Sequence, residues 1–244
     1  TTSGILVNDA ENLTVENNIV EVSGLNSYAF EANMNHSMIK LNSFETHKLT
    51  PETERTHTAF VICDSNYNII ANNTIKSDGA NCVYLSSYPG VDIHAGPSNY
   101  NIITGNNISA ANSAWSYSIQ IMGSKNNVSK NYVSGGYKGI STQGSGNIIT
   151  ENDVDAENQG ILAADNSVVV GNYVHTSGSS TGIAVDGNNV LIANNTIITQ
   201  NGPGIDIFSD SGSNSTLSGN NITSNNYGIY SKGEYTQITD TTGM

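Results

Sequence analysis

Basic residues are scarce in this sequence, which has 8 Lys and Arg against 21 Asp and Glu among 244 residues. The resulting formal net charge is −13. Because so few basic groups offset the repulsion from phosphate, nucleic acids and anionic membranes are excluded as partners. Long apolar runs are also lacking, since none approaches the roughly 18 residues that span a bilayer. The sequence therefore predicts no transmembrane segment.

Cysteine and proline are rare as well, with two and four residues. Asparagine, by contrast, accounts for 36 of the 244 residues and is accompanied by abundant Ser, Thr, Gly and Ile. Disordered chains share this polarity, but they lack regularly spaced β-branched residues. Here Ile and Val recur at regular distances from asparagine, which indicates a repeat protein.

An eight-residue pattern, N-I-I-x-x-N-x-I, recurs along the chain. It is clearest at Asn68–Ile75, Asn101–Ile108, Asn126–Val133 and Asn147–Val154, and weaker copies lie at Asn12–Ile19, Ser37–Phe44, Ser167–Val174, Val190–Ile197 and Ser215–Ile222. Stacked copies of the sixth residue, which we call the anchor, are expected to form a hydrogen-bonded ladder. The predicted ladder residues are Asn17, Asn42, Asn73, Asn106, Asn131, Asn152, Asn172, Asn195 and Asn220.

A Gly-Ile pair follows most copies, beginning at Gly139, Gly160, Gly182, Gly204 and Gly228. Each period of 20–33 residues thus contains short β-type runs between turn residues, without helical periodicity. Such a unit buries its apolar residues only by stacking on its neighbours. The sequence therefore predicts an all-β, parallel β-helix solenoid of about nine coils, forming a single domain over 1–244. Two long intervals predict insertions at about 43–59 and 86–100.

The octets and Gly-Ile pairs resemble the repeats of right-handed parallel β-helices, the fold of pectate-lyase-like proteins. The Asn- and Ile-rich, Arg-poor composition is most similar to the adhesin-like and surface-layer β-helix proteins of methanogenic archaea. This resemblance covers about residues 8–240 and implies right-handed coils and an extracellular or cell-surface location. It implies no particular activity, because the fold hosts lyases, hydrolases, epimerases and non-enzymatic surface proteins.

Outward residues of the strands that begin with Gly-Ile carry the catalytic groups in carbohydrate-active β-helices. In this sequence they are mostly small, neutral or apolar. The catalytic candidates are Asp186 and Asp206, which fall on adjacent coils roughly 8 Å apart. Such a separation suits the acid and base of an inverting glycoside hydrolase. Solvated carboxylates on neighbouring coils of an acidic solenoid are the alternative interpretation.

The two insertions flank one predicted groove that contains aromatic and polar residues. The candidate ligand-binding residues are Tyr84, Tyr88, Asp92, His94, His57 and Asp64. Tyrosine rings suit stacking on sugars, whereas His and Asp suit metal or acid–base chemistry. The histidines and aspartates match no tight metal-ligand spacing. We therefore expect glycan binding, with no metal and no cofactor.

Two cysteines, Cys63 and Cys82, fall on consecutive coils but about three residues apart along the strands, which exceeds the roughly 7 Å reach of a disulfide. We expect two thiols. Eight Asn-x-Ser/Thr sequons would permit N-glycosylation of an exported protein. They begin at Asn12, Asn35, Asn72, Asn107, Asn127, Asn194, Asn214 and Asn221.

The leading functional hypothesis is a non-enzymatic extracellular β-helix, adhesin-like or structural, that binds a cell-surface or environmental polysaccharide. The competing hypothesis is a carbohydrate-active enzyme, namely a glycoside hydrolase, polysaccharide lyase or epimerase. A third is a structural subunit that associates with itself through exposed end coils. Acids, a base and aromatic side chains converging on one outward face would favour the enzyme.

Overall fold

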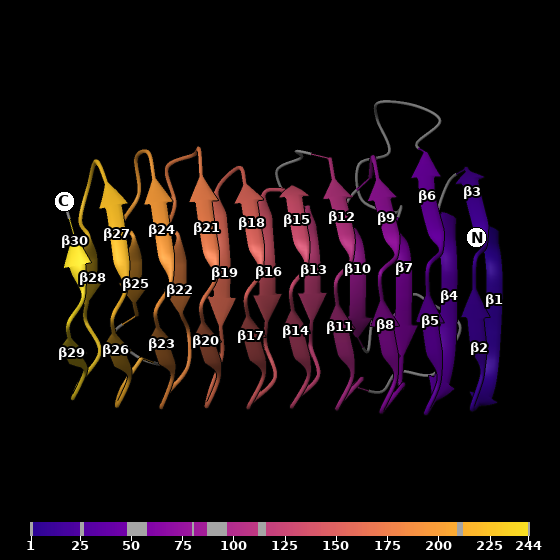
Figure 1. Cartoon of the computed structure of the whole chain (residues 1–244), viewed down its shortest axis with the longest axis horizontal. Helices are drawn as coiled ribbons and strands as arrows, with labels where there is room; N and C mark the ends of the chain where they lie inside the picture. Colours follow the sequence, from indigo (N-terminus) through magenta and orange to yellow (C-terminus); the bar gives the residue numbers. More distant parts are fainter. Residues whose placement is uncertain are drawn as a thin grey trace.

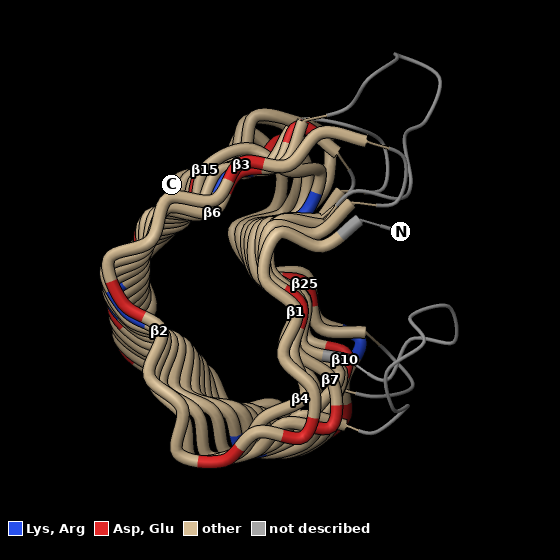
Figure 2. Tube along the Cα trace, turned by 90° about the vertical axis from the view of Figure 1, so that its right-hand side faces the viewer, with Lys and Arg blue, Asp and Glu red and all other residues tan. Residues whose placement is uncertain are grey.

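The computed structural model describes residues 2–24, 27–47, 58–79, 81–86, 97–111, 116–208 and 212–243. These residues form 30 β-strands, and none of them belongs to a helix long and apolar enough to cross a membrane. The strands stack into a rod that has the two chain ends at its opposite ends (Figure 1). Viewed along the rod, three sheets surround one interior (Figure 2).

Each sheet is parallel and ten-stranded, and we name the three sheets A, B and C. Sheet A contains β1 (Thr2–Glu11), β4 (Ser27–Asn35), β7 (Thr58–Cys63), β10 (Asn81–Ser86), β13 (Tyr117–Ile121), β16 (Lys138–Thr142), β19 (Gln159–Ala163), β22 (Ile183–Val185), β25 (Ile205–Ile207) and β28 (Ile229–Ser231). Sheet B contains β2 (Thr14–Glu16), β5 (Met38–Lys40), β8 (Ile69–Ala71), β11 (Ile102–Thr104), β14 (Asn127–Ser129), β17 (Ile148–Thr150), β20 (Val168–Val170), β23 (Leu191–Ala193), β26 (Thr216–Ser218) and β29 (Gln237–Thr239). Sheet C contains β3 (Ile19–Ser23), β6 (Ser43–His47), β9 (Thr74–Ser77), β12 (Asn107–Ala110), β15 (Tyr132–Gly135), β18 (Asp153–Ala156), β21 (Tyr173–Thr176), β24 (Thr196–Thr199), β27 (Asn221–Ser224) and β30 (Thr242–Gly243).

These sheets confirm the predicted all-β parallel solenoid. Each octet supplies one strand to sheet B and the next to sheet C, whereas the Gly-Ile segments supply sheet A. The ten strands of each sheet give one coil more than the nine anchors indicate. In the last coil Thr242 pairs with Asn221, so that Thr241 occupies the anchor position opposite Asn220. A search for asparagine anchors therefore misses this copy.

The core is a stack of like residues from successive coils. The middle residue of the sheet B strands points inward, so that Ile39, Ile70 and Ile103 are fully buried between partly exposed neighbours. Near the N-terminus, the rings of Phe30 and Phe60 stack with their centroids 4.8 Å apart. In sheets B and C the strands bury one side and expose the other at least in part, whereas β7 and β22 of sheet A are buried on both sides.

Anchor asparagines join the coils through their side chains. Each side-chain nitrogen donates to the side-chain oxygen of the next anchor over 2.9–3.0 Å. The chain of bonds runs through Asn42, Asn73, Asn106, Asn131, Asn152, Asn172, Asn195 and Asn220. The same side-chain oxygens also accept hydrogen bonds from the backbone N–H groups of the neighbouring anchors. These bonds provide partners for backbone donors in the turn between sheets B and C.

The first predicted ladder residue is wrong by one position. Asn18, not Asn17, donates from its backbone and its side chain to Asn42 Oδ1, each over 2.9 Å. Pairing of Thr14 with Met38 moves the first octet one residue along, which turns Val15 inward. Asn17 is exposed and has a φ of 59°. In this turn the left-handed backbone belongs to the residue before the anchor, as it also does at Asn72 with a φ of 55°.

A second ladder lies at the first position of the octet and was not predicted. The side chain of Asn68 donates to Asn101 over 3.0 Å, Asn101 donates to Asn126 over 3.1 Å, and Asn126 donates to Asn147 over 3.2 Å. These four residues are fully buried. The four clearest octets therefore carry hydrogen-bonded asparagines at both turns that flank sheet B.

Glycine of the Gly-Ile pair lies where the chain passes from sheet C to sheet A. A Cβ on Gly204 would overlap the Ile222 side chain and lie 2.7 Å from the Gly228 carbonyl oxygen. The space where a Cβ would lie on Gly139, Gly160 or Gly182 is likewise occupied by a Val or Ile side chain of the following coil. The pair is thus a packing requirement, because the next coil's sheet C side chain occupies the place of the missing Cβ.

The described parts of the two predicted insertions are short. Residues 43–47 form β6 and residues 58–59 begin β7, so the first extra segment is confined to 48–57, outside the described residues. In the second, only 86 and 97–100 are described.

Candidate functional site

Sheet A presents the outward row in which catalytic residues were expected. Tyr84, Gln120 and Ser141 occupy equivalent places in successive coils, and Ala184 and Asp206 do so further along. Asp206 lies between Ala184 of the preceding coil and Tyr230 of the next. The row therefore mixes apolar, amide, hydroxyl and single acidic side chains.

The catalytic candidates Asp186 and Asp206 lie on this face, one coil apart. Asp186 directly follows β22 and is exposed, two residues beyond the Ala184 that pairs with Asp206. Partial burial raises the pKa of the Asp206 carboxyl, and the positive charge of Lys232 opposes that shift. The Lys232 ammonium lies 5.2 Å from the centroid of the Tyr230 ring. A raised pKa suits a general acid, but it also follows from partial burial alone.

Tyr84, a candidate ligand-binding residue, lies in an apolar cluster on the outer face of sheet A. Its side chain is 7% exposed and packs with Val61 and Cys63, and its hydroxyl donates to Met122 Sδ over 3.4 Å. Asp64 follows β7, is exposed and has a φ of 46°. The other four candidates, Tyr88, Asp92, His94 and His57, lie outside the described residues.

The cysteines face different environments, and no disulfide joins them. Cys63 belongs to the outer cluster of sheet A, whereas Cys82 lies in the core. Cys82 Sγ donates to the Ile75 carbonyl oxygen over 3.0 Å, and burial raises the pKa of its thiol. The predicted pair of thiols is therefore confirmed.

Over the described residues, no group of three or more His, Cys, Asp or Glu side chains could hold a metal ion.

Most sequon asparagines are exposed, at turns or on the outer faces of strands. Asn35 and Asn127 are partly buried, and the exposed ones are Asn12, Asn72, Asn107, Asn194, Asn214 and Asn221. These six are therefore accessible at the surface.

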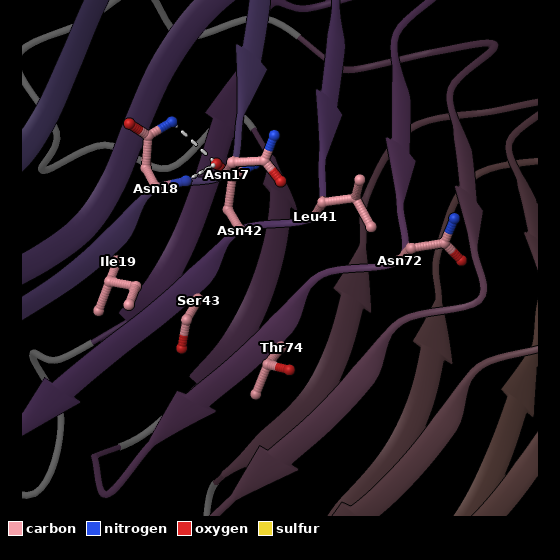
Figure 3. Close-up of a pocket in the computed structure, with 8 residues that line it drawn as sticks. All are labelled: Asn17, Asn18, Ile19, Leu41, Asn42, Ser43, Asn72 and Thr74. Atoms are coloured by element: carbon pink, nitrogen blue, oxygen red, sulfur yellow. Dashed lines mark hydrogen bonds between the residues drawn. The ribbon is translucent and has the colours of Figure 1, made fainter.

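A shallow hollow of about 440 Å³ lies at the corner between sheets B and C in the first three coils (Figure 3). Ile19 and Leu41, which are 80% and 50% exposed, give it an apolar surface. The remaining lining residues are Asn17, Asn18, Asn42, Ser43, Asn72 and Thr74. All eight side chains are apolar, amide or hydroxyl. The hollow can therefore offer hydrogen bonds and apolar contact, but its lining supplies no acid or base.

Sheet C carries a group of aromatic and charged residues that the Gly-Ile pattern does not predict. Tyr132, Asp153 and Tyr173 occupy the same outward position in three consecutive coils. In the next outward position, His175 Nδ1 lies 2.8 Å from Asp155 Oδ1. The tyrosines follow the anchor directly, at the seventh octet position. An inspection of that position in every copy would have found them.

Another exposed aromatic column lies at the turn between sheets A and B. His36, Tyr67 and Tyr100 stack face to face with centroids 5.1 and 4.9 Å apart. Lys125 ends the column, 5.2 Å from the centroid of the Tyr100 ring and 3.0 Å from its hydroxyl. That hydrogen bond raises the pKa of Lys125. The inner ring faces of this column are occupied by its own members.

Comparison with known families identifies two matches. The family described as "Right handed beta helix region" matches residues 1–154. The family described as "Periplasmic copper-binding protein (NosD)" matches residues 114–240. No curated protein and no solved structure matches the chain significantly.

Proposed function

This chain belongs to the right-handed parallel β-helix family and carries a NosD-like β-helix domain over residues 114–240, and from that premise we propose that it is a non-enzymatic, extracytoplasmic rod that binds glycans. The family alone selects no activity, because the β-helix hosts enzymes and binding proteins alike. The choice between these depends on the surface chemistry of this chain.

The observation that carries the proposal is the lining of the hollow between sheets B and C (Figure 3). Its eight residues provide apolar contact and hydrogen bonds without an ionisable side chain. Acid–base catalysis of glycoside cleavage requires a group that gives a proton and a group that takes one. A surface of this composition suits recognition of sugar hydroxyls and C–H groups, and it supports binding without turnover.

The extracytoplasmic location is supported by the NosD match, since that family is described as periplasmic. Accessible sequons such as Asn72 and Asn194 and the net charge of −13 are compatible with a cell-surface protein. A surface adhesin or an envelope structural module is the specific form that we propose.

The copper binding in the description of the NosD family is not part of the proposal. The described residues contain no group of three His, Cys, Asp or Glu side chains placed to hold a metal. Cys82, a soft donor, is fully buried in the core with its thiol bonded to a backbone oxygen. Neither observation on the described residues supports a copper site.

A carbohydrate-active enzyme is the second candidate function, favoured by one observation. Asp206 has a raised pKa and lies on the same outer face as Asp186, one coil away. The two carboxyls would act as acid and base of a glycoside hydrolase.

The experiment that tests the proposal is a glycan array with neutral and acidic polysaccharides, in which binding and product release are measured in the same wells. We expect binding without release of reducing ends. Release that is abolished by Asp186→Asn or Asp206→Asn would show a hydrolase instead. Absence of both binding and release would favour a purely structural rod.

A further inference from the structure

The strands β15, β18 and β21 are neighbours in sheet C (Figure 1). At one outward position they carry two tyrosines on either side of an aspartate. Tyr132 is 50% exposed and Tyr173 is 44% exposed. Asp153 lies directly between them and is exposed. Side chains on a sheet stand roughly perpendicular to it, so all three project into solvent from one flat face.

The ring faces of Tyr132 and Tyr173 are available to a ligand. Tyr67 and Tyr100 are exposed to a similar degree, but their rings stack on one another. Across the described residues, no ring contact involves Tyr132 or Tyr173. An aromatic face left uncovered in a well-ordered sheet is suited to packing against the C–H face of a sugar ring.

Polar groups around the tyrosines suit hydroxyl recognition. The Asp153 carboxylate makes no hydrogen bond or ion pair with another described residue, so its oxygens can accept hydrogen bonds from two sugar hydroxyls. His175 Nδ1 lies 2.8 Å from Asp155 Oδ1, and this contact fixes the imidazole ring beside Tyr173 on the same strand. At the edge of the group, the Lys130 ammonium forms an ion pair with Glu151, with Nζ 3.6 Å from Oε2.

The charge of this face selects against anionic ligands. The segment around β18 exposes four carboxylates in alternation, Glu151, Asp153, Asp155 and Glu157. Among the described residues, basic side chains pair with only two of these four carboxylates, Glu151 and Asp155. A uronate or sulfated chain would be repelled here, as it would by the net charge of −13. An uncharged sugar meets no such penalty.

Spacing adds a further restriction. Neighbouring parallel strands are roughly 5 Å apart, so the two tyrosines, two coils apart, are separated by about 10 Å along the rod. In an extended β-1,4-linked chain every second sugar presents the same face. The distance between two such sugars is similar to the separation of the two tyrosines. We infer that the outer face of β15, β18 and β21 binds a neutral β-1,4-linked glycan along the rod axis, through Tyr132, Asp153 and Tyr173. This inference rests on the proposed glycan-binding function.

Calorimetric titration of the full chain with defined hexasaccharides tests the inference. The probes are cellohexaose and N-acetylchitohexaose as neutral β-1,4 chains, maltohexaose as a neutral α-linked chain, and hexagalacturonate as an anionic chain. We expect a β-1,4 chain to bind at least about tenfold more tightly than the other two types. Loss of one stacking ring, in Tyr132→Ala or Tyr173→Ala, is expected to weaken binding about tenfold.

Matched variants separate this surface from others. Tyr235→Ala removes a tyrosine that is 78% exposed elsewhere on the rod, and it should leave binding unchanged. Circular dichroism and melting curves of each variant check that it is folded. Binding by the wild type that survives both sheet C substitutions, or is lost instead in Tyr88→Ala, would overturn this inference while the proposed function stands.

Ligand preference gives the remaining outcomes. Equal affinity for maltohexaose, or preference for hexagalacturonate, would also overturn the inference. If no hexasaccharide binds but the glycan array does find a ligand, the inference is wrong and the proposed function stands. If neither experiment finds binding, both are wrong.

Discussion

The side-chain nitrogen of Asn106 donates to the side-chain oxygen of Asn131 over 2.9 Å, joining residues 25 positions apart in the chain. Asn106 also donates to the carbonyl oxygens of Ile70 and Thr104, while its own oxygen accepts from the backbone and side chain of Asn73. One buried amide therefore serves three consecutive coils. Its loss would leave polar groups in the two neighbouring coils without a partner.

Replacing Asn106 by alanine is expected to lower the free energy of unfolding by about 2–4 kcal/mol, because buried donors and acceptors would lose their partners. Asn107→Ala is the matched control, since Asn107 is the next residue in the chain and is exposed on β12. Urea unfolding of both variants measures the difference. Equal effects would show that the ladder contributes little to stability.

Gly204→Ala should destabilise the rod by about 1–3 kcal/mol, the usual cost of overpacking a core. The added Cβ would meet the Ile222 side chain and the Gly228 carbonyl oxygen. Gly228→Ala provides the comparison, because a Cβ at this equivalent repeat position has no neighbour within 4 Å. Thermal melting should distinguish the two. A melting temperature that falls as much for Gly228→Ala as for Gly204→Ala would contradict the packing explanation.

Both cysteines are expected to resist a thiol reagent in native buffer and to react fully in denaturant. Cys63 and Cys82 are 2% and 0% exposed, and a raised pKa keeps Cys82 protonated at neutral pH. Titration with a chromogenic disulfide reagent should give two thiols per denatured chain. A Cys63→Ala variant should give one. Fewer thiols in freshly unfolded, unreduced wild type would reveal a disulfide.

Asp206 should make stability depend on pH in a defined direction. Because folding raises the pKa of its carboxyl, the folded state holds this proton more tightly than the unfolded state does. The resulting stability is present below the ordinary carboxyl range and is lost as pH rises through the raised pKa. Asp206→Asn should therefore be more stable than the wild type at pH 7, by less than about 1 kcal/mol given solvent screening, and the gain should vanish in acid.

Removing the charge that opposes this shift gives the converse test. Lys232 lowers the pKa of Asp206, so Lys232→Gln should raise it further and reduce stability at neutral pH. Melting temperatures measured from pH 3 to pH 8 check both variants. A stability gain of Asp206→Asn that persists unchanged in acid would disprove the role of ionisation.

The fold could be predicted from the sequence because one repeat determines the environment of nearly every residue. Ile70 and Ile103 recur at the same octet position and are buried for the same reason. The register of the first coil could not be predicted in this way, since the Asn17-Asn18 pair offers two anchors. Inward burial of Val15 settles the choice in favour of Asn18.

The candidate site was less accessible to such reasoning. The Gly-Ile pattern predicts the outward row of sheet A but carries no information on the tyrosines of sheet C. Repeat patterns reveal what successive coils share, whereas Tyr132 and Tyr173 are distinctive because most other copies carry Asn, Thr or Ser at that position. Exposure, which separates a packed tyrosine such as Tyr84 from an accessible one, also requires the structure.

The ladder also has an evolutionary consequence. Each internal anchor donates a side-chain hydrogen bond to the anchor of the next coil and accepts the same kind of bond from the anchor of the coil before. Adjacent coils are therefore interchangeable at these contacts. Duplication or deletion of one complete coil would preserve the bonding on both sides of the junction. A gain or loss of a single residue within an octet would break it. Descent in this lineage should therefore proceed by whole-coil changes in length, with substitutions accumulating on the outward positions between them.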